Sequence, residues 1–86
     1  MSTPTLVRWA LQHVSSRCFM TENPTEPHAP GWSDSPAQAV LAIDPDLFAD
    51  RLRQSLTPSL LSHCRLVRVR FCFGDNDLWG WWQIDA

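Results

Sequence analysis

Cysteine, histidine and aspartate are the residues of this chain with the best-suited side chains for binding a metal or attacking a substrate. His63 and Cys64 are adjacent, and the remaining candidates are spread widely, at His13, Cys18, His28 and Cys72. A zinc site needs ligands gathered at a spacing such as CxxC, HxH or HExxH, and none of these patterns occurs. We therefore expect no metal site.

The same residues give no clear catalytic set. A Cys–His pair activates a nucleophile when the two side chains meet in space, whereas sequence neighbours usually point apart. Asp44, Asp46 and Asp50 are typical of a helix start, and the three glycines, at 31, 74 and 80, form no phosphate-binding loop. We expect a protein without a cofactor that is not an enzyme.

The closing stretch RLVRVRFCFGDNDLWGWWQIDA contains three of the five tryptophans and predicts a β-hairpin. Asp75-Asn76 suits a two-residue turn, which sets the pairing of the two strands. One face is then apolar and faces the core, with the pairs Phe73/Leu78, Phe71/Gly80, Val69/Trp82 and Val67/Ile84. The other face has the pairs Cys72/Trp79, Arg70/Trp81, Arg68/Gln83 and Leu66/Asp85.

The second face combines residue types that are frequent in binding sites. We name Arg68, Arg70, Trp79 and Trp81 the tryptophan–arginine face, and expect guanidinium groups to lie over indole rings there. Three interpretations stay open. The pairs are internal contacts on a half-exposed sheet face, they bind a protein, or they stack on a ligand or on the bases of a single-stranded nucleic acid.

Helices are predicted between about 36 and 62, broken at prolines. Ser35-Pro36, Asp44-Pro45 and Thr57-Pro58 each place a capping residue before a proline, as Thr3-Pro4 does earlier in the chain. The segment AQAVLAI favours two helical turns. In DLFADRLRQSL one stripe at helical spacing is formed by Leu47, Phe48, Arg51, Leu52 and Leu56.

The first third of the chain is less clear. Residues 5–20 fit either a helix or a strand, and a strand is favoured because an isolated hairpin needs a third strand or a packed helix. Residues 21–34 contain three prolines and a glycine, which predicts a long loop without regular structure, functional or disordered, anchored to the core by Trp32.

Composition narrows the function classes. The 86 residues carry a net charge of −2, with seven arginines and no lysine, which argues against nucleic-acid binding, since phosphate contacts need an excess of basic residues. No targeting or membrane-spanning segment is visible, and three widely spaced cysteines are unlike a secreted disulfide scaffold, so we expect a cytoplasmic protein with reduced thiols. The lack of lysine beside many Ala, Pro and Arg suggests a bacterial, phage or mobile-element origin.

The sequence thus predicts a small α+β protein with a single domain, 1–86. It has a C-terminal antiparallel hairpin (about 65–84), a third N-terminal strand, and proline-broken helices (about 36–62) on the apolar face of the hairpin. We expect a non-enzymatic accessory or inhibitory protein that binds a protein partner, or its own copy as a homodimer, through Arg68, Arg70, Trp79 and Trp81. The alternatives are single-stranded nucleic-acid binding and a small-ligand site between the helices and the Trp32 loop.

Overall fold

A computed structural model describes residues 6–22, 30–74 and 79–85 of the chain. Five antiparallel strands form one sheet in the order β3-β2-β1-β4-β5. The elements are β1 (Leu6–His13), β2 (Phe19–Thr21), β3 (Gly31–Ser33), the 3-10 turn η1 (Pro36–Gln38), α1 (Pro45–Ser55), α2 (Pro58–Leu61), β4 (Cys64–Phe73) and β5 (Gly80–Ile84). The predicted α+β class, the C-terminal hairpin and the N-terminal strand are confirmed.

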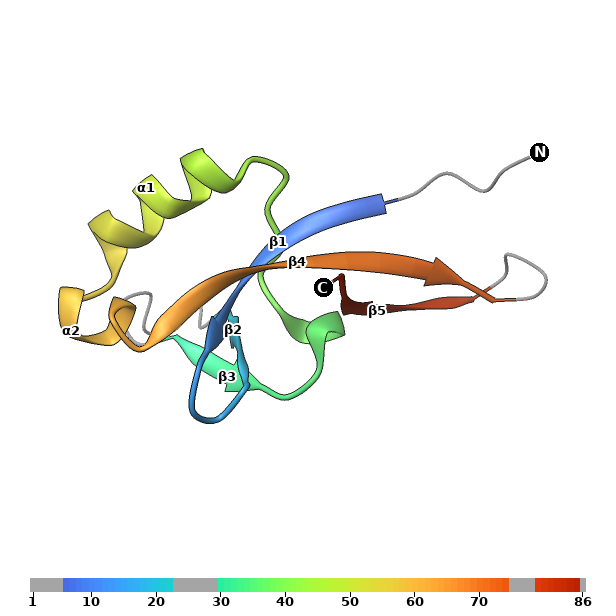
Figure 1. The fold of residues 1–86 in the computed structure, drawn as a ribbon, viewed down its shortest axis with the longest axis horizontal. Coiled ribbons are helices and arrows are strands. Elements are labelled where there is room, and N and C mark those ends of the chain that lie inside the picture. Colours follow the sequence, from blue (N-terminus) through green and yellow to red (C-terminus); the bar gives the residue numbers. More distant parts are fainter. Residues whose placement is uncertain (1–5, 23–29, 75–78, 86) are drawn as a thin grey trace.

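The centre of the sheet is the ladder between β1 and β4 (Figure 1). It pairs every residue of β1, from Leu6 opposite Phe71 to His13 opposite Cys64. Because side chains alternate along a strand, this register divides both strands between two faces. Ala10, Val67 and Val69 lie on one face and Leu11 and Leu66 on the other, and each face carries its own apolar cluster.

Helices α1 and α2 cover the face that bears Leu11 and Leu66, which we call the helix face. Phe48, Leu52 and Leu56 from α1 and its C-cap are buried there against Leu11 and Met20 of the sheet. Two predicted caps hold these helices in place. The Asp44 carboxylate accepts hydrogen bonds from the backbone amides of Asp46 and Leu47, and the Thr57 hydroxyl accepts one from Leu60.

The prediction that these helices pack on the face of Val67, Val69 and Trp82 was wrong. They occupy the opposite face, because β1 supplies Leu11 and β2 supplies Met20 on that side of the sheet. A hairpin considered alone shows its more apolar face as the core, whereas the complete sheet has apolar side chains on both faces.

The face of Val67 and Val69, which we call the opposite face, is covered in part by Ala39 and Leu41, whereas Val40 between them packs against the helix-face cluster. Ala39 and Leu41 pack there with Ala10, Phe19 and Trp82. The predicted two-turn helix over AQAVLAI is therefore wrong, since only Pro36–Gln38 forms a 3-10 turn. The chain continues extended, and Ala42 exchanges backbone hydrogen bonds of 2.7 and 2.8 Å with Trp9. These tertiary bonds replace the local helical bonds that the composition favours.

The 21–34 segment also contains regular structure that the sequence did not predict. Thr21 is the last residue of β2, and Gly31–Ser33 form β3, which pairs with it. Trp32 packs against the helix-face cluster, as predicted, and its ring lies nearly perpendicular to that of His13, with the centroids 5.7 Å apart. Thr3-Pro4 and the Asp75-Asn76 turn lie outside the described residues.

Two leucines of α1 give a matched test of this packing. Leu52 is 5% exposed in the cluster, whereas Leu47, also predicted to lie in the buried stripe, is 58% exposed. We expect Leu52→Ala to lower the free energy of unfolding by about 2–5 kcal/mol. Leu47→Ala should lower it by no more than about 0.5 kcal/mol.

Urea unfolding followed by circular dichroism measures both values. Equal losses for the two variants would contradict the orientation of α1.

Candidate binding surface on the C-terminal hairpin

The observed register of the hairpin differs from the predicted one by two residues. Phe73 lies opposite Gly80, Phe71 opposite Trp82 and Val69 opposite Ile84, so Trp82 does not pair with Val69. A shift of two residues preserves which side chains share a face, because the side-chain period of a strand is two. Trp79, Trp81, Arg68 and Arg70 therefore lie on one face, as expected, while their individual neighbours change.

Both tryptophans of this face are open to solvent. Trp79 is 61% exposed and Trp81 44%, and their ring centroids lie 5.3 Å apart with the planes tilted by 31°. They form a continuous aromatic patch near the end of the hairpin. Gly74 lies directly beneath the Trp79 indole, which a Cβ atom there would strike.

The arginines make different contacts from those predicted. Arg68 Nε donates to the Asp85 carboxylate at 3.0 Å, since the shifted register places these two residues opposite each other. Arg70 is exposed and lies opposite Gln83. Among the described residues no guanidinium lies over an indole ring, so the predicted cation–π pairs are not part of this structure.

The other side of the hairpin is an aromatic cluster. The Phe71 ring contacts Phe73 and Trp82 edge to face, at centroid distances of 4.9 and 5.1 Å. Gly80 makes this possible, because a Cβ atom there would collide with the Phe71 ring and the Cys72 carbonyl. The close approach predicted for Gly80 and Phe71 is confirmed, although the two are diagonal neighbours. Trp82 also packs against the opposite-face cluster, which confirms the prediction that it belongs to the core.

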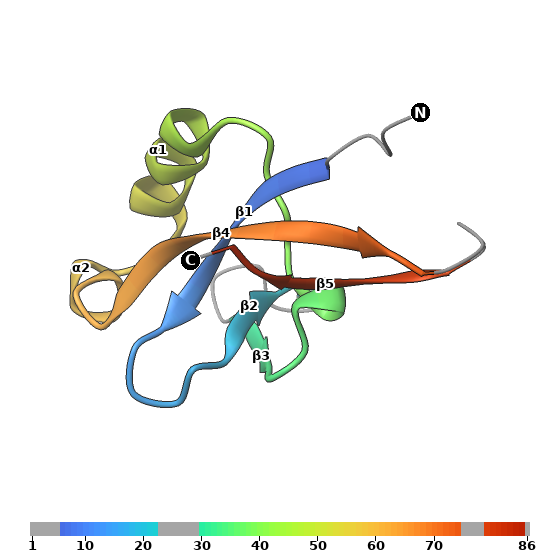
Figure 2. The same cartoon turned by 45° about the vertical axis from the view of Figure 1, so that its right-hand side comes forward.

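The outer part of the hairpin extends away from the helices. Figure 1 shows α1 and α2 over one end of the sheet, with β4 and β5 continuing to the other end of a molecule that measures 45 × 24 × 23 Å. The turned view in Figure 2 shows the same separation. The helix-face cluster contains neither Trp79 nor Trp81, so the tryptophan–arginine face lies beyond the part of that face that α1 covers.

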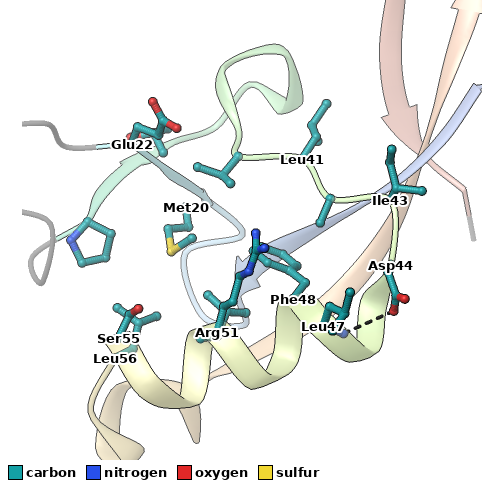
Figure 3. A pocket seen from close by; sticks show the side chains of 15 residues that line it. Met20, Glu22, Leu41, Ile43, Asp44, Leu47, Phe48, Arg51, Ser55 and Leu56 are labelled. Atoms are coloured by element: carbon teal, nitrogen blue, oxygen red, sulfur yellow. Dashed lines mark hydrogen bonds between the residues drawn. The ribbon is translucent and has the colours of Figure 1, made fainter.

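A groove with a volume of about 690 Å³ lies beside α1, and sequence analysis did not locate it. In Figure 3 its walls are α1 and the extended segment from Leu41 to Asp44, with Met20 from β2. The lining is mostly apolar, and Ile43 and Leu47 are 76% and 58% exposed. The sequence feature that could have indicated the groove is Ile43, directly before the Asp44-Pro45 cap. This apolar residue precedes the helix and so cannot belong to its buried stripe.

Arg51 is the basic residue of the groove. Its side chain rises from α1 beside Phe48 into the hollow (Figure 3), and no ion pair of Arg51 is present among the described residues. The Asp44 carboxylate, on the same lining, is held by two backbone amides of α1. The groove thus offers an apolar surface with the Arg51 guanidinium as a hydrogen-bond donor, and the Glu22 carboxylate also lies on its lining (Figure 3).

The cysteines and histidines do not assemble a catalytic set in the described part of the chain. Burial raises the pKa of the Cys64 thiol, which opposes formation of the thiolate that a nucleophile needs. His63 stacks on His13 at 6.1 Å. Within residues 6–22, 30–74 and 79–85, no three Cys, His or acidic side chains gather as metal ligands, and no helix is long and apolar enough to cross a membrane.

Comparisons of the chain with known protein families, with curated proteins and with solved structures give no match.

The raised pKa of Cys64 has a measurable consequence. The folded state favours the protonated thiol of Cys64. Its contribution to the free energy of unfolding is therefore complete at a pH below the pKa of the unfolded thiol, and is lost as the pH rises through the higher pKa of the folded thiol. We expect iodoacetamide to alkylate Cys64 more slowly at pH 8 in the native protein than in urea, as measured by mass spectrometry of the peptide. Faster alkylation of the native protein would instead indicate an activated thiolate.

Proposed function

We propose that this chain is a non-enzymatic binding protein that associates with another protein, or with its own copy, through the tryptophan–arginine face. The observation that carries the proposal is the adjacent pair Trp79 and Trp81, which is exposed at the end of the hairpin away from the helices. Large aromatic side chains are costly to leave in water, and Trp and Arg dominate the energetics of protein interfaces.

The position of the pair supports the same conclusion. A partner that approaches the outer hairpin meets side chains from two neighbouring strands, held by the ladder between β4 and β5. The aromatic cluster of Phe71, Phe73 and Trp82 supports these strands from the other side. The tryptophans are thus presented on a defined surface, which limits the entropy lost on binding.

The charges favour a protein over a nucleic acid. Arg68 is engaged with Asp85, and the chain has a net charge of −2, so phosphate binding would depend on few cations. We place the protein in the cytoplasm, on the basis of its odd and widely spaced cysteines.

Trp81→Ala and Trp82→Ala form a matched pair, because the two residues are adjacent and lie on opposite faces of β5. Trp81→Ala should change the free energy of unfolding by only about 0.5 kcal/mol, as for an exposed residue, and should weaken association. Trp82→Ala should destabilise the domain by about 3 kcal/mol, since its ring packs against Phe71 and the opposite-face cluster.

Urea unfolding measures the first effect. Light scattering over a dilution series, followed by capture from cells with immobilised wild-type and Trp81→Ala protein, measures the second. Two equally destabilised variants with unchanged association would disprove the proposal.

The groove beside α1 supports a second candidate, a small-ligand site. Its volume lies in the range of small-molecule pockets, and its apolar lining with Arg51 suits an apolar molecule that carries one hydrogen-bond acceptor group. This site is independent of the hairpin surface, so both proposals can hold together.

Arg51→Ala and Arg53→Ala test the groove. Arg53 is paired with Asp50 on the same helix and does not line the groove, so it is the control. A thermal-shift screen with small apolar acids and amides should find compounds that stabilise the wild type and Arg53→Ala, but stabilise Arg51→Ala less. If no compound stabilises the wild type, this candidate is excluded for the classes screened.

A further inference from the structure

Strand β5 lies at the edge of the sheet, with β4 on one side. The hydrogen bonds of the hairpin alternate, and two of them identify the residues that face β4. Asp85 donates its backbone N–H to Arg68, and Trp79 accepts one from Gly74. Residues 79, 81, 83 and 85 therefore bond to β4, and the backbone groups of Gly80, Trp82 and Ile84 point away from it.

The outer edge of β5 has no strand partner in the described structure, although the 3-10 turn η1 lies close to β5 (Figure 1). Within the described ranges, no backbone group of another segment bonds to Gly80, Trp82 or Ile84. Natural edge strands usually avoid pairing by carrying a charge, a proline or a bulge, and GWWQI has no charged residue and no proline. Ile84 is 42% exposed.

We propose that β5 pairs with β5 of a second copy of this chain, antiparallel and centred on Trp82, so that two sheets become one continuous sheet. The inference rests on the proposed function and names its partner. Centring on Trp82 uses all three outward residues, because each can then exchange both backbone hydrogen bonds with the other copy. A shift of the centre by one residue in either direction leaves one of them unpaired.

The side chains are complementary in this register. On the opposite face, Trp82 meets Trp82 of the second copy, and Ile84 stands across from Gly80, where the missing side chain leaves Ile84 access to the Phe71 ring. On the tryptophan–arginine face, Trp81 stands across from Gln83, and the two Trp81 rings are diagonal neighbours about 7–8 Å apart at Cα. The exposed Trp81 is thereby covered.

The electrostatics permit the pairing. The five residues of β5 bring no charge to the contact, and the flanking Asp85 is neutralised by Arg68 of its own chain. Contact between two copies of an acidic protein therefore introduces no like-charge pair at the strand edge. An acidic or basic peptide would gain no charge partner from the strand itself, which favours the second copy as the occupant.

Ile84→Lys and Ile43→Lys test the pairing, because each places a lysine at an exposed isoleucine and only the first lies on β5. In sedimentation equilibrium over a dilution series, the wild type should dimerise, and Ile84→Lys should raise the dissociation constant about tenfold or more, since charged edges resist pairing. Ile43→Lys should leave it unchanged. A far-ultraviolet circular dichroism spectrum like that of the wild type verifies that both variants fold.

Amide hydrogen exchange measured by NMR tests the register. Protection of the Gly80, Trp82 and Ile84 amides should increase with protein concentration, whereas the Trp81 and Gln83 amides, which already bond to β4, should be protected throughout.

A monomer at all concentrations overturns strand pairing and leaves binding of a different protein through Trp81 intact. A dimer that Trp81→Ala weakens, but whose Gly80, Trp82 and Ile84 amides exchange independently of concentration, also overturns it and supports contact through the tryptophan–arginine face alone. If Ile84→Lys weakens the dimer and Trp81→Ala has no effect, strand pairing stands and the proposed function of the tryptophans fails.

Discussion

The antiparallel ladder between β1 and β4 is the contact from which the other parts of this fold take their positions. It joins residues that are 51 positions apart at His13 and Cys64 and 65 apart at Leu6 and Phe71, and both of its faces are apolar, so each face can hold a separate cluster. A buried polar contact accompanies it. Gln12 is 2% exposed, donates to the Arg17 carbonyl and accepts from the Arg65 guanidinium, which satisfies a side chain that would otherwise be costly to bury.

The two halves of the sheet have different surroundings, and this difference separates stability from binding. Near α1 the helix face is covered, and Ala39 and Leu41 pack on the opposite face. Beyond the helices, β4 and β5 continue with Trp79 and Trp81 exposed (Figure 1). Residues in the first half serve the core, so changes there should act on folding, while changes at the outer hairpin should act on association.

Much of the candidate surface could be predicted from the hairpin sequence, because side chains alternate along each strand and a register shift of two residues leaves the same side chains on each face. The contacts of Arg68 and Arg70 could not be predicted, because they depend on which residue lies opposite each arginine. A two-residue shift changes that residue but leaves the apolar pattern of the hairpin intact, so the pattern does not distinguish the two registers. The groove beside α1 was also beyond prediction, because its walls come from β2, residues 41–44 and α1, which meet only in the folded chain.

The sequence by itself determined the features that depend on neighbouring residues. These are the hairpin and its two faces, the Asp44 and Thr57 caps, and the placement of Trp79 and Trp81 on a different side from Trp82. Only the tertiary structure determined which face the helices cover and made AQAVLAI mostly extended. Both outcomes depend on β1, which supplies Leu11 to the helix face and the backbone partner of Ala42 at Trp9. Contacts at such separations leave no periodic signal in the segments that they bring together.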